Sequence, residues 1–375
     1  MLQPVLDFAR RRGLRRERSI TRGASATNAS FRARKIGNRE SSRGADGAQG
    51  FAEATLGGTS PCMLTRMRVL VLGGSGLVGS RACQLWGGDA EVVAPSHGEL
   101  DVLDTPALSA FVECCQPDAI VNLAAWADVD AAEPQRDDKQ GTVFALNVRF
   151  PGELARLCVR SRRYLVHVST DYVFDGTRLD RPYSEADTPN PLCWYAQTKY
   201  WGEQRVLEAH PDACIARIEM PFTATEHRKS DFPRLVVRRL THGQSVAGVL
   251  DQRITPVLLD DAVFALRALV DRHVGGIVHV ASTSWTTPYE LARAIASRMA
   301  LDSTRIEATK FDEFATTRPA RRPQHSWLDV SFFEQACASR ILRTVDAQLD
   351  AWVAQASGTQ SANISEDRWS YTSSR

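Results

Sequence analysis

The chain has 375 residues, of which 43% are hydrophobic and 24% charged, and its 46 basic residues nearly balance its 44 acidic ones. This composition is typical of a globular protein and excludes a fibrous, collagen-like or wholly disordered chain. A net charge of +2 gives no general case for a nucleic acid or membrane partner, and no run approaches the roughly 18 apolar residues of a spanning helix. The eight cysteines include no C-x-x-C pair, so we expect reduced thiols and a cytoplasmic protein.

The two ends of the chain differ from its middle. Residues 1–66 are rich in Arg, Ser and Gly and lack hydrophobic periodicity, so we predict a disordered extension. Two interpretations stay open: a transit peptide, which would direct the protein to an organelle, or, as the favoured alternative, a dispensable extension or a start assigned too far upstream. Met63 and Met67 immediately precede the first strand, as the second interpretation requires. The polar run 357–375 is predicted to be a flexible tail.

From Arg68 onward, short apolar runs alternate with helical patterns. We expect strands at 69–72, 91–94, 119–123, 164–169 and 213–218, and helices at 77–86, 105–115, 142–161 and 194–209. This alternation predicts an α/β fold, with a Rossmann-type doubly wound parallel sheet over residues 67–217. Further helices are expected at 231–241, 260–270, 288–299 and 344–354. Residues 218–356 are therefore predicted to form mainly a smaller C-terminal α/β substrate-binding domain.

A glycine-rich loop follows the first strand. Gly73-Gly74-Ser75-Gly76-Leu77-Val78-Gly79 has the spacing G-x-x-G-x-x-G and leads directly into a helix. Backbone N–H groups at such a helix start can face a pyrophosphate, so the loop predicts a dinucleotide site. No acid follows the second strand, where residues 95–97 read Pro-Ser-His. That absence slightly favours NADPH over NADH and leaves both open.

Tyr195 and Lys199 are four residues apart in an expected helix, so they share one face. A nearby ammonium stabilises tyrosinate and lowers the tyrosine pKa. We therefore expect Tyr195 to donate a proton to a carbonyl group near neutral pH.

Hydroxyl and carboxyl groups follow the apolar strand that ends near residue 169. Ser169, Thr170 and Asp171 stand where the carboxyl ends of parallel strands face a ligand crevice. Hydroxyls there can stabilise charge on a substrate carbonyl oxygen. His167 is interpreted as a core residue, and no pair of histidines has the spacing of a metal site. We predict no metal.

With these motifs in place, the chain from Arg68 to about Ala354 resembles the extended short-chain dehydrogenase/reductases, and among them the dTDP-4-dehydrorhamnose (RmlD-like) reductases. The matching segments cover most of the folded chain. They are the glycine loop, Glu99 to Val102, Val121 to Ala125, Ser169 to Gly176, Tyr195 to Lys199, and Ala320 to Pro323 with Ser326 and Leu328.

The resemblance implies NAD(P)H-dependent reduction of the 4-keto group of a nucleotide-linked 6-deoxy sugar. It implies a catalytic triad of Thr170, Tyr195 and Lys199, in which Lys199 also binds the nicotinamide ribose, and a substrate contact at Asp171. Arg322 is predicted to bind the substrate diphosphate through its guanidinium fork. The implied cofactor contacts also include Gly73, Ser75, Gly76, Leu77, Val78, Gly79, Asp101, Val102, Ala124 and Ala125.

Two alternative functions remain. A cofactor-recycling epimerase fits less well, because those relatives carry Thr-Asp-Glu where this chain has Thr170-Asp171-Tyr172. An NADP-binding regulatory subunit, similar to the methionine adenosyltransferase beta subunit, would keep the same Tyr/Lys pair.

The chain departs from the family pattern at Ile218 to Phe222, which leaves the substrate sugar open. Residues 225–230 either replace the missing contacts or, as we expect, form a solvated loop. The oligomeric state is open, with a homodimer among the options.

Overall fold

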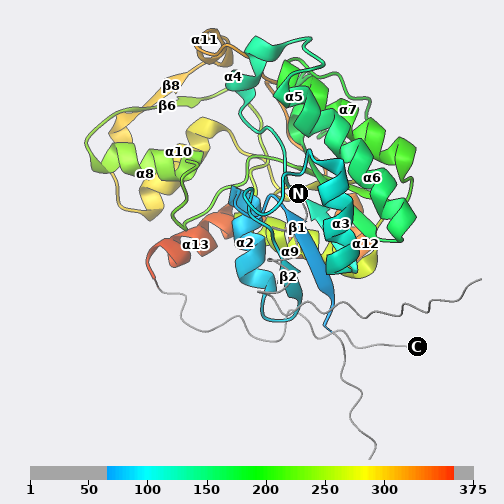
Figure 1. Ribbon diagram of the computed structural model, residues 1–375. Coiled ribbons are helices and arrows are strands. Elements are labelled where there is room, and N and C mark those ends of the chain that lie inside the picture. Colours follow the sequence, from blue (N-terminus) through cyan, green and yellow to red (C-terminus); the bar gives the residue numbers. More distant parts are fainter. Residues whose placement is uncertain (1–65, 359–375) are drawn as a thin grey trace, which may run out of the picture. The chain divides into compact units, whose positions relative to one another are not determined.

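The computed structural model describes residues 66–358, and the predictions for the terminal extension and the tail beyond 358 lie outside these residues. A six-stranded, fully parallel sheet has the order β2-β1-β3-β4-β5-β7 (Figure 1). The chain order doubles back at β1, which is the doubly wound arrangement expected from the sequence. The strands are β1 (Arg68–Leu72), β2 (Glu91–Val93), β3 (Ala119–Asn122), β4 (Tyr164–Thr170), β5 (Cys214–Ile218) and β7 (Gly276–Val280).

Both faces of this sheet are buried under helices. Alternate residues of each strand point to opposite faces, so each strand contributes to both apolar clusters. In β1, Val69 and Val71 join one apolar cluster while Leu70 and Leu72 join another. The first cluster includes residues of α2 (Leu77–Trp86), α9 (Leu259–Arg272) and α12 (Ser331–Cys337). The second includes residues of α3 (Thr105–Cys115), α6 (Phe150–Ser161) and α7 (Trp194–Ala209). The continuous apolar strands follow from this double covering.

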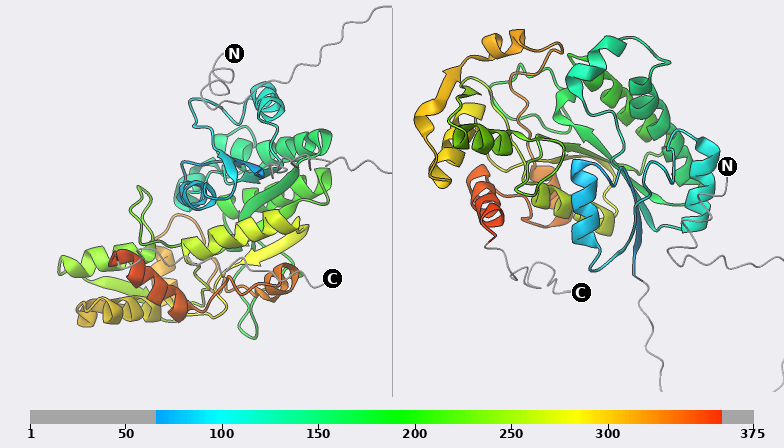
Figure 2. Two further views of the ribbon diagram at one scale, coloured as in Figure 1. Left: turned by 90° about the horizontal axis from the view of Figure 1, so that it is seen from below. Right: turned by 60° about the vertical axis from the view of Figure 1, so that its left-hand side comes forward.

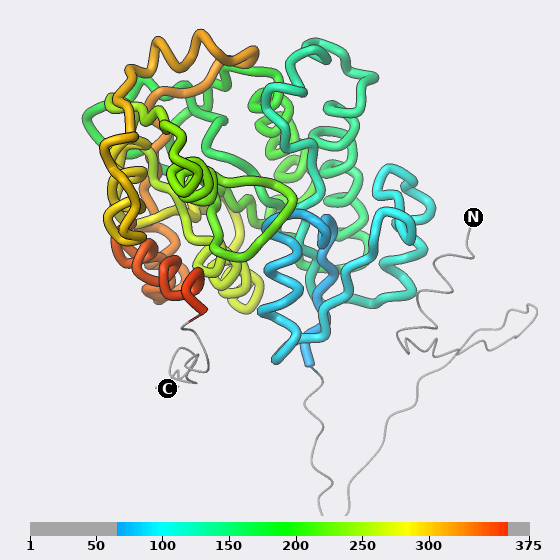
Figure 3. The backbone as a smooth tube through the Cα atoms, turned by 90° about the vertical axis from the view of Figure 1, so that its left-hand side faces the viewer, coloured from blue at the N-terminus to red at the C-terminus, as the bar shows by residue number. Residues whose placement is uncertain are grey.

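The C-terminal part has its own small core. Strands β6 (Val246–Val249) and β8 (Ile306–Thr309) form a separate parallel pair. They pack with α8 (Phe232–Thr241), α10 (Pro288–Arg298) and α13 (Val345–Ala356) around a third apolar cluster. Figures 2 and 3 show these elements gathered on one side, away from α3 and α6. The short helix α11 (Phe311–Thr316) follows β8.

The structure divides one expected element and adds a strand to the large sheet. The helix expected at 142–161 is divided into α5 (Thr142–Phe144), a π-helical turn (Ala145–Arg149) and α6. The sixth strand, β7, was not expected, and it comes from residues predicted to belong mainly to the substrate-binding part. The division at residue 217 stays a prediction, since the chain leaves the large sheet after β5 and returns to it at β7.

Within residues 66–358, no helix is both long and apolar enough to cross a membrane.

Candidate active site

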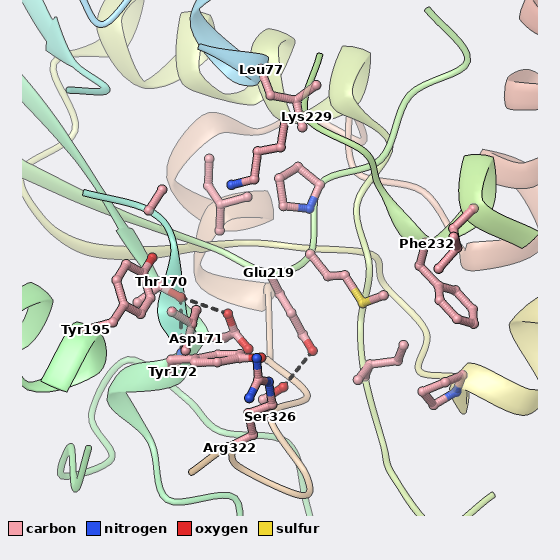
Figure 4. Close-up of a pocket in the computed structure, with 18 of the residues that line it drawn as sticks. Leu77, Thr170, Asp171, Tyr172, Tyr195, Glu219, Lys229, Phe232, Arg322 and Ser326 are labelled. Carbon is pink, nitrogen blue, oxygen red and sulfur yellow. Dashed lines mark hydrogen bonds between the residues drawn. The ribbon is translucent and has the colours of Figure 1, made fainter. Parts of the chain in front are cut away.

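A cavity of about 1050 Å³ lies where the carboxyl ends of β1, β3, β4 and β5 meet the C-terminal part. This edge of a doubly wound sheet is where such folds bind ligands, and the volume is that of a small-molecule site. Figure 4 shows Thr170, Asp171 and Tyr195 on one side, with Leu77 and Lys229 on another. The lining is rich in basic side chains: Lys199, Arg228, Lys229, Arg239, Arg318 and Arg322.

The glycine loop forms one wall of the cavity. Helix α2 begins without a side-chain cap and has no acidic residue in its first turn, so its first N–H groups are free for an anion. Gly73 has a φ of +87°, and a Cβ there would lie 2.7 Å from the Ala124 nitrogen. A Cβ on Gly79 would lie 2.3 Å from the Gly73 oxygen. Glycine is therefore required for the close approach of strand, loop and helix.

Thr170 and Lys199 converge at the end of β4. Lys199, on α7, donates a hydrogen bond of 2.7 Å from Nζ to the Val168 carbonyl, and its side chain is buried. Burial lowers the pKa of Lys199 to about 8, against a smaller raising effect from Glu203. The Thr170 hydroxyl accepts a hydrogen bond from the Tyr172 N–H and donates to the Asp171 carboxyl at 3.0 Å.

The expected lowering of the Tyr195 pKa is not what the structure gives. Burial dominates and raises the pKa of Tyr195, while hydrogen bonding to Thr170 lowers it by less. Lys199 is not among the groups that shift the Tyr195 pKa most, and its ammonium donates a hydrogen bond to the Val168 carbonyl. Tyr195 thus remains protonated across the neutral range, which is the form that a proton donor needs.

Asn147 supports this arrangement, although the sequence analysis did not single it out. It lies in the π-helical turn and is fully buried. Its side chain bonds to the Trp126 N–H at 2.9 Å and donates to the Thr198 hydroxyl at 3.1 Å. The loop after β3 is thereby fixed against the helix that carries Tyr195 and Lys199. An amide inside an apolar helical stretch was the only signal available in the sequence.

A second acid in the cavity wall also escaped the sequence analysis. Glu219, 1% exposed, lies at the end of β5 and accepts a hydrogen bond of 2.8 Å from the Ser326 hydroxyl. Its other oxygen accepts the Thr255 N–H at 2.9 Å and the Thr255 hydroxyl. Asp171, which is 4% exposed, is the other buried carboxyl of the cavity lining. Figure 4 shows the hydrogen bond from Ser326 to Glu219 and the one from Thr170 to Asp171.

Arg322 lines the cavity, but its guanidinium is already paired. It forms a two-pronged ion pair with Asp130, with distances of 3.0 and 2.7 Å, and donates to the Ala320 carbonyl at 2.9 Å. Hydrogen bonding to Arg322 holds the pKa of Asp130 below its usual range. Diphosphate binding by Arg322 stays a prediction. The hydrogen bonds to Asp130 and Ala320 reduce the number of guanidinium N–H groups that this side chain has available for a diphosphate.

The cavity gathers most of the predicted contacts, but four of them, all within residues 66–358, lie outside its lining: Ser75, Asp101, Val102 and Ala124. Asp101 is exposed and caps the Leu103 N–H at 3.0 Å. Contact of these four residues with the adenine end and centre of a cofactor stays a prediction. The loop expected to be solvated contributes His227, Arg228 and Lys229 to the lining.

Within the described part of the chain, no group of three His, Cys, Asp or Glu residues is arranged to hold a metal ion.

The sheet is of the Rossmann type, the helix behind the glycine loop has a free start, and a Thr/Tyr/Lys group lies near the carboxyl end of β4. Together these features define a dinucleotide-dependent oxidoreductase of the short-chain dehydrogenase/reductase type. The family described as the RmlD substrate binding domain matches residues 67–357. The chain belongs to this family.

Named relatives agree with the family match. A probable low-salt glycan biosynthesis reductase from Haloferax volcanii is 32% identical over 300 residues, which cover 76% of this chain and 98% of the relative. A dTDP-4-dehydrorhamnose reductase from Mycolicibacterium smegmatis is 33% identical, with coverage of 78% and 87%. The dTDP-4-dehydrorhamnose reductase from Bacillus anthracis, crystallised with NADP, superposes with a TM-score of 0.70 at 24% identity and covers 77% of this chain and 99% of its own. That last likeness shows the fold.

Proposed function

We propose that the protein is an NAD(P)H-dependent reductase that converts the 4-keto group of a nucleotide-linked 6-deoxy sugar to a hydroxyl. The observation that carries the proposal is that Thr170, Tyr195 and Lys199 line the same cavity as the glycine loop. The names of the relatives support the reaction class and the substrate class. The basic lining suits a substrate with a diphosphate.

The residues present fit a nicotinamide dinucleotide. The start of α2 has no side-chain cap, and the glycines of the loop leave space that a Cβ would fill. Both features suit the pyrophosphate of the cofactor. Lys199 suits the ribose beside the nicotinamide. When bound, the reduced cofactor supplies the hydride.

Side chains of the protein then bind and protonate the keto oxygen. Thr170 and Tyr195 hold that oxygen by hydrogen bonds, and Tyr195 transfers its phenolic proton to the oxygen as negative charge develops there. Lys199, as an ammonium, stabilises the tyrosinate that is left. The raised pKa of Tyr195 keeps the proton available beforehand.

The decisive assay is NADPH oxidation with dTDP-4-keto-6-deoxy sugars by wild-type protein and by Tyr195→Phe. We expect Tyr195→Phe to lose about 100-fold or more in kcat, because the proton donor is gone. Tyr200→Phe is the matched control on the same helix, outside the cavity lining, and is expected to keep wild-type activity. Equal rates for wild type and Tyr195→Phe would contradict the mechanism. Cofactor binding without turnover by any 4-keto sugar would instead favour the regulatory-subunit alternative.

We further propose a cytoplasmic enzyme with a free nucleotide-sugar substrate and no nucleic acid or membrane partner. None of the seven cysteines among residues 66–358 is in a disulfide, as a reducing compartment allows. Imaging of the full chain and of a chain begun at Met67, each with a C-terminal fluorescent fusion, tests this location. Organellar import that depends on residues 1–66 would support the transit-peptide interpretation instead. Light scattering of the same proteins would show whether the protein is a homodimer.

A further inference from the structure

The basic side chains of the cavity differ in whether the protein already holds them. Four of the six are engaged, two with backbone carbonyls and two with Asp130. These four are Lys199, Arg239, Arg318 and Arg322. Within residues 66–358, the side chains of the other two, Arg228 and Lys229, form no hydrogen bond and no ion pair. Their charges are therefore available to a ligand.

Lys229 lies at the wall of the cavity that the glycine loop forms. Figure 4 shows its side chain beside Leu77, with the ammonium inside the cavity. Leu77 is the first residue of α2. Burial lowers the pKa of Lys229 and outweighs a raising effect of Asp128, as expected for an ammonium among protein groups. The residue is nevertheless accessible to solvent, so a ligand can reach it.

The backbone that carries Lys229 is fixed by Arg234 of α8. Arg234 donates hydrogen bonds to the carbonyl of His227, at 3.1 Å, and to that of Lys229. The same guanidinium donates to Asp231 at 2.7 Å, and the Lys229 N–H donates to Nδ1 of His227 at 3.0 Å. These bonds give a defined conformation to a segment that was expected to be a solvated loop. The direction of the Lys229 side chain follows from them.

The charges at this wall indicate the kind of ligand. The start of a helix carries a partial positive charge, and α2 has no acidic residue in its first turn to balance it. An ammonium beside the same helix start adds to the positive charge, and an anion between the two relieves their repulsion. Because Leu77 belongs to the first turn of α2, this anion is the group that the N–H groups of that turn bind.

We propose that Lys229 binds the pyrophosphate of the nicotinamide dinucleotide, together with the first N–H groups of α2. The inference rests on the proposed reductase function and adds a cofactor-binding residue to it. It also assigns a role to residues 225–230, which the sequence connected only with the substrate. The C-terminal part of the chain then contributes a cation to the cofactor site as well as binding the sugar.

The first test measures cofactor binding to the full chain without any sugar. Fluorescence titration gives the Kd of NADPH and of NADH for the wild type, Lys229→Gln and Lys229→Arg. We expect Lys229→Gln to raise both Kd values about tenfold, because one charge-assisted hydrogen bond to the pyrophosphate is lost. Lys229→Arg keeps the charge and is expected to stay within about threefold of the wild type. Wild-type affinity in Lys229→Gln would overturn the proposal.

Lys310→Gln is the matched control, because Lys310 is an exposed lysine of the C-terminal part outside the cavity lining. It is expected to bind both cofactors as the wild type does. Two other results would also overturn the proposal. A loss of NADPH affinity without a loss of NADH affinity would assign Lys229 to the 2′-phosphate. A higher KM for the sugar with unchanged cofactor affinity would assign it to the diphosphate of the substrate.

The dependence of Kd on salt separates a direct charge contact from a structural effect. Added NaCl screens charge contacts, so the NADPH Kd of the wild type should rise with salt more steeply than that of Lys229→Gln. Equal slopes would contradict a contact between the ammonium and the pyrophosphate. Lys229→Glu is a second variant of the same exposed position, and it should bind both cofactors more weakly than Lys229→Gln because its carboxylate repels the pyrophosphate. Binding as tight as that of Lys229→Gln would count against the proposal.

These binding measurements also separate the inference from the proposed function. If the Kd values change as expected but the wild type reduces no 4-keto sugar, the proposed function fails and the role of Lys229 stands. If the wild type reduces the sugar and Lys229→Gln binds NADPH and NADH normally, the inference fails and the proposed function stands.

Discussion

Lys199 gives the site its expected dependence on pH. Burial lowers the pKa of this lysine to about 8, so the ammonium is present below that pH and lost above it. Since Tyr195 stays protonated to higher pH, we expect kcat/KM of the wild type to fall as pH rises through about 8. In Lys199→Arg the guanidinium stays charged, so the fall should move to higher pH even though the bulkier group lowers the maximum rate.

The control for this prediction is Lys139→Arg, an exposed lysine, which should leave the profile unchanged. The measurement is kcat/KM against pH for the three proteins. A fall that starts at the same pH in Lys199→Arg as in the wild type would assign the titration to another group.

The residues of the site differ in how far the sequence could reveal them. Thr170, Tyr195 and Lys199 were predictable because strand ends and helix spacing are local patterns. Ser326 and Glu219 are 107 residues apart, and only the fold brings their side chains to 2.8 Å. The burial of the Tyr195 phenol was equally hidden, and it explains why the Tyr195 pKa is raised rather than lowered.

At the scale of elements, the start of α2 is the most constrained piece of the site. In Gly79→Ala, the new methyl group would lie 2.3 Å from the Gly73 oxygen, so the loop must move away from the helix. We expect the free energy of unfolding to fall by about 1–3 kcal/mol, as for other overpacked sites. NADPH binding should weaken at least about tenfold, since the N–H groups no longer converge on the pyrophosphate.

Gly88→Ala is the control, because nothing lies within 4 Å of a Cβ there. Fluorescence titration with NADPH and urea unfolding measure the two effects. Unchanged NADPH affinity in Gly79→Ala would show that the loop does not hold the pyrophosphate.

Elements with strong local signals were predicted well. The helix expected at 105–115 begins after Asp104, which caps Ala107, and has Pro106 in its first turn. The strands β6 and β8 were missed, since Val-Ala-Gly-Val and Ile-Glu-Ala-Thr are only four residues long and lack a continuous apolar run. The strand β7 was missed for a different reason: nothing in its sequence shows that the chain returns to the first sheet.

That return matters for the whole molecule, because the large sheet depends on residues far along the chain. Trp86 of α2 donates from Nε1 to the Val263 carbonyl of α9 at 3.2 Å, and the Tyr164 hydroxyl donates to the Val274 carbonyl at 2.7 Å. Arg81 pairs with Asp260 through two hydrogen bonds of 2.6 and 2.8 Å. Helix α9 and strand β7 thus cover one face and one edge of the sheet that residues 67–217 begin.

We therefore expect a fragment of residues 66–217 to fail to fold on its own, although it contains the glycine loop, Thr170, Tyr195 and Lys199. Without α9, the apolar side of α2 and one face of the sheet would be exposed, and β5 would become an open edge. The fragment should show no cooperative thermal transition and no NADPH binding, whereas residues 66–358 should show both. A cooperative transition in the short fragment would mean that the nucleotide-binding half is an independent domain ending near residue 217. Failure of the fragment to fold would mean that the catalytic groups are held in place only when the residues after 217, which return to the large sheet, are present.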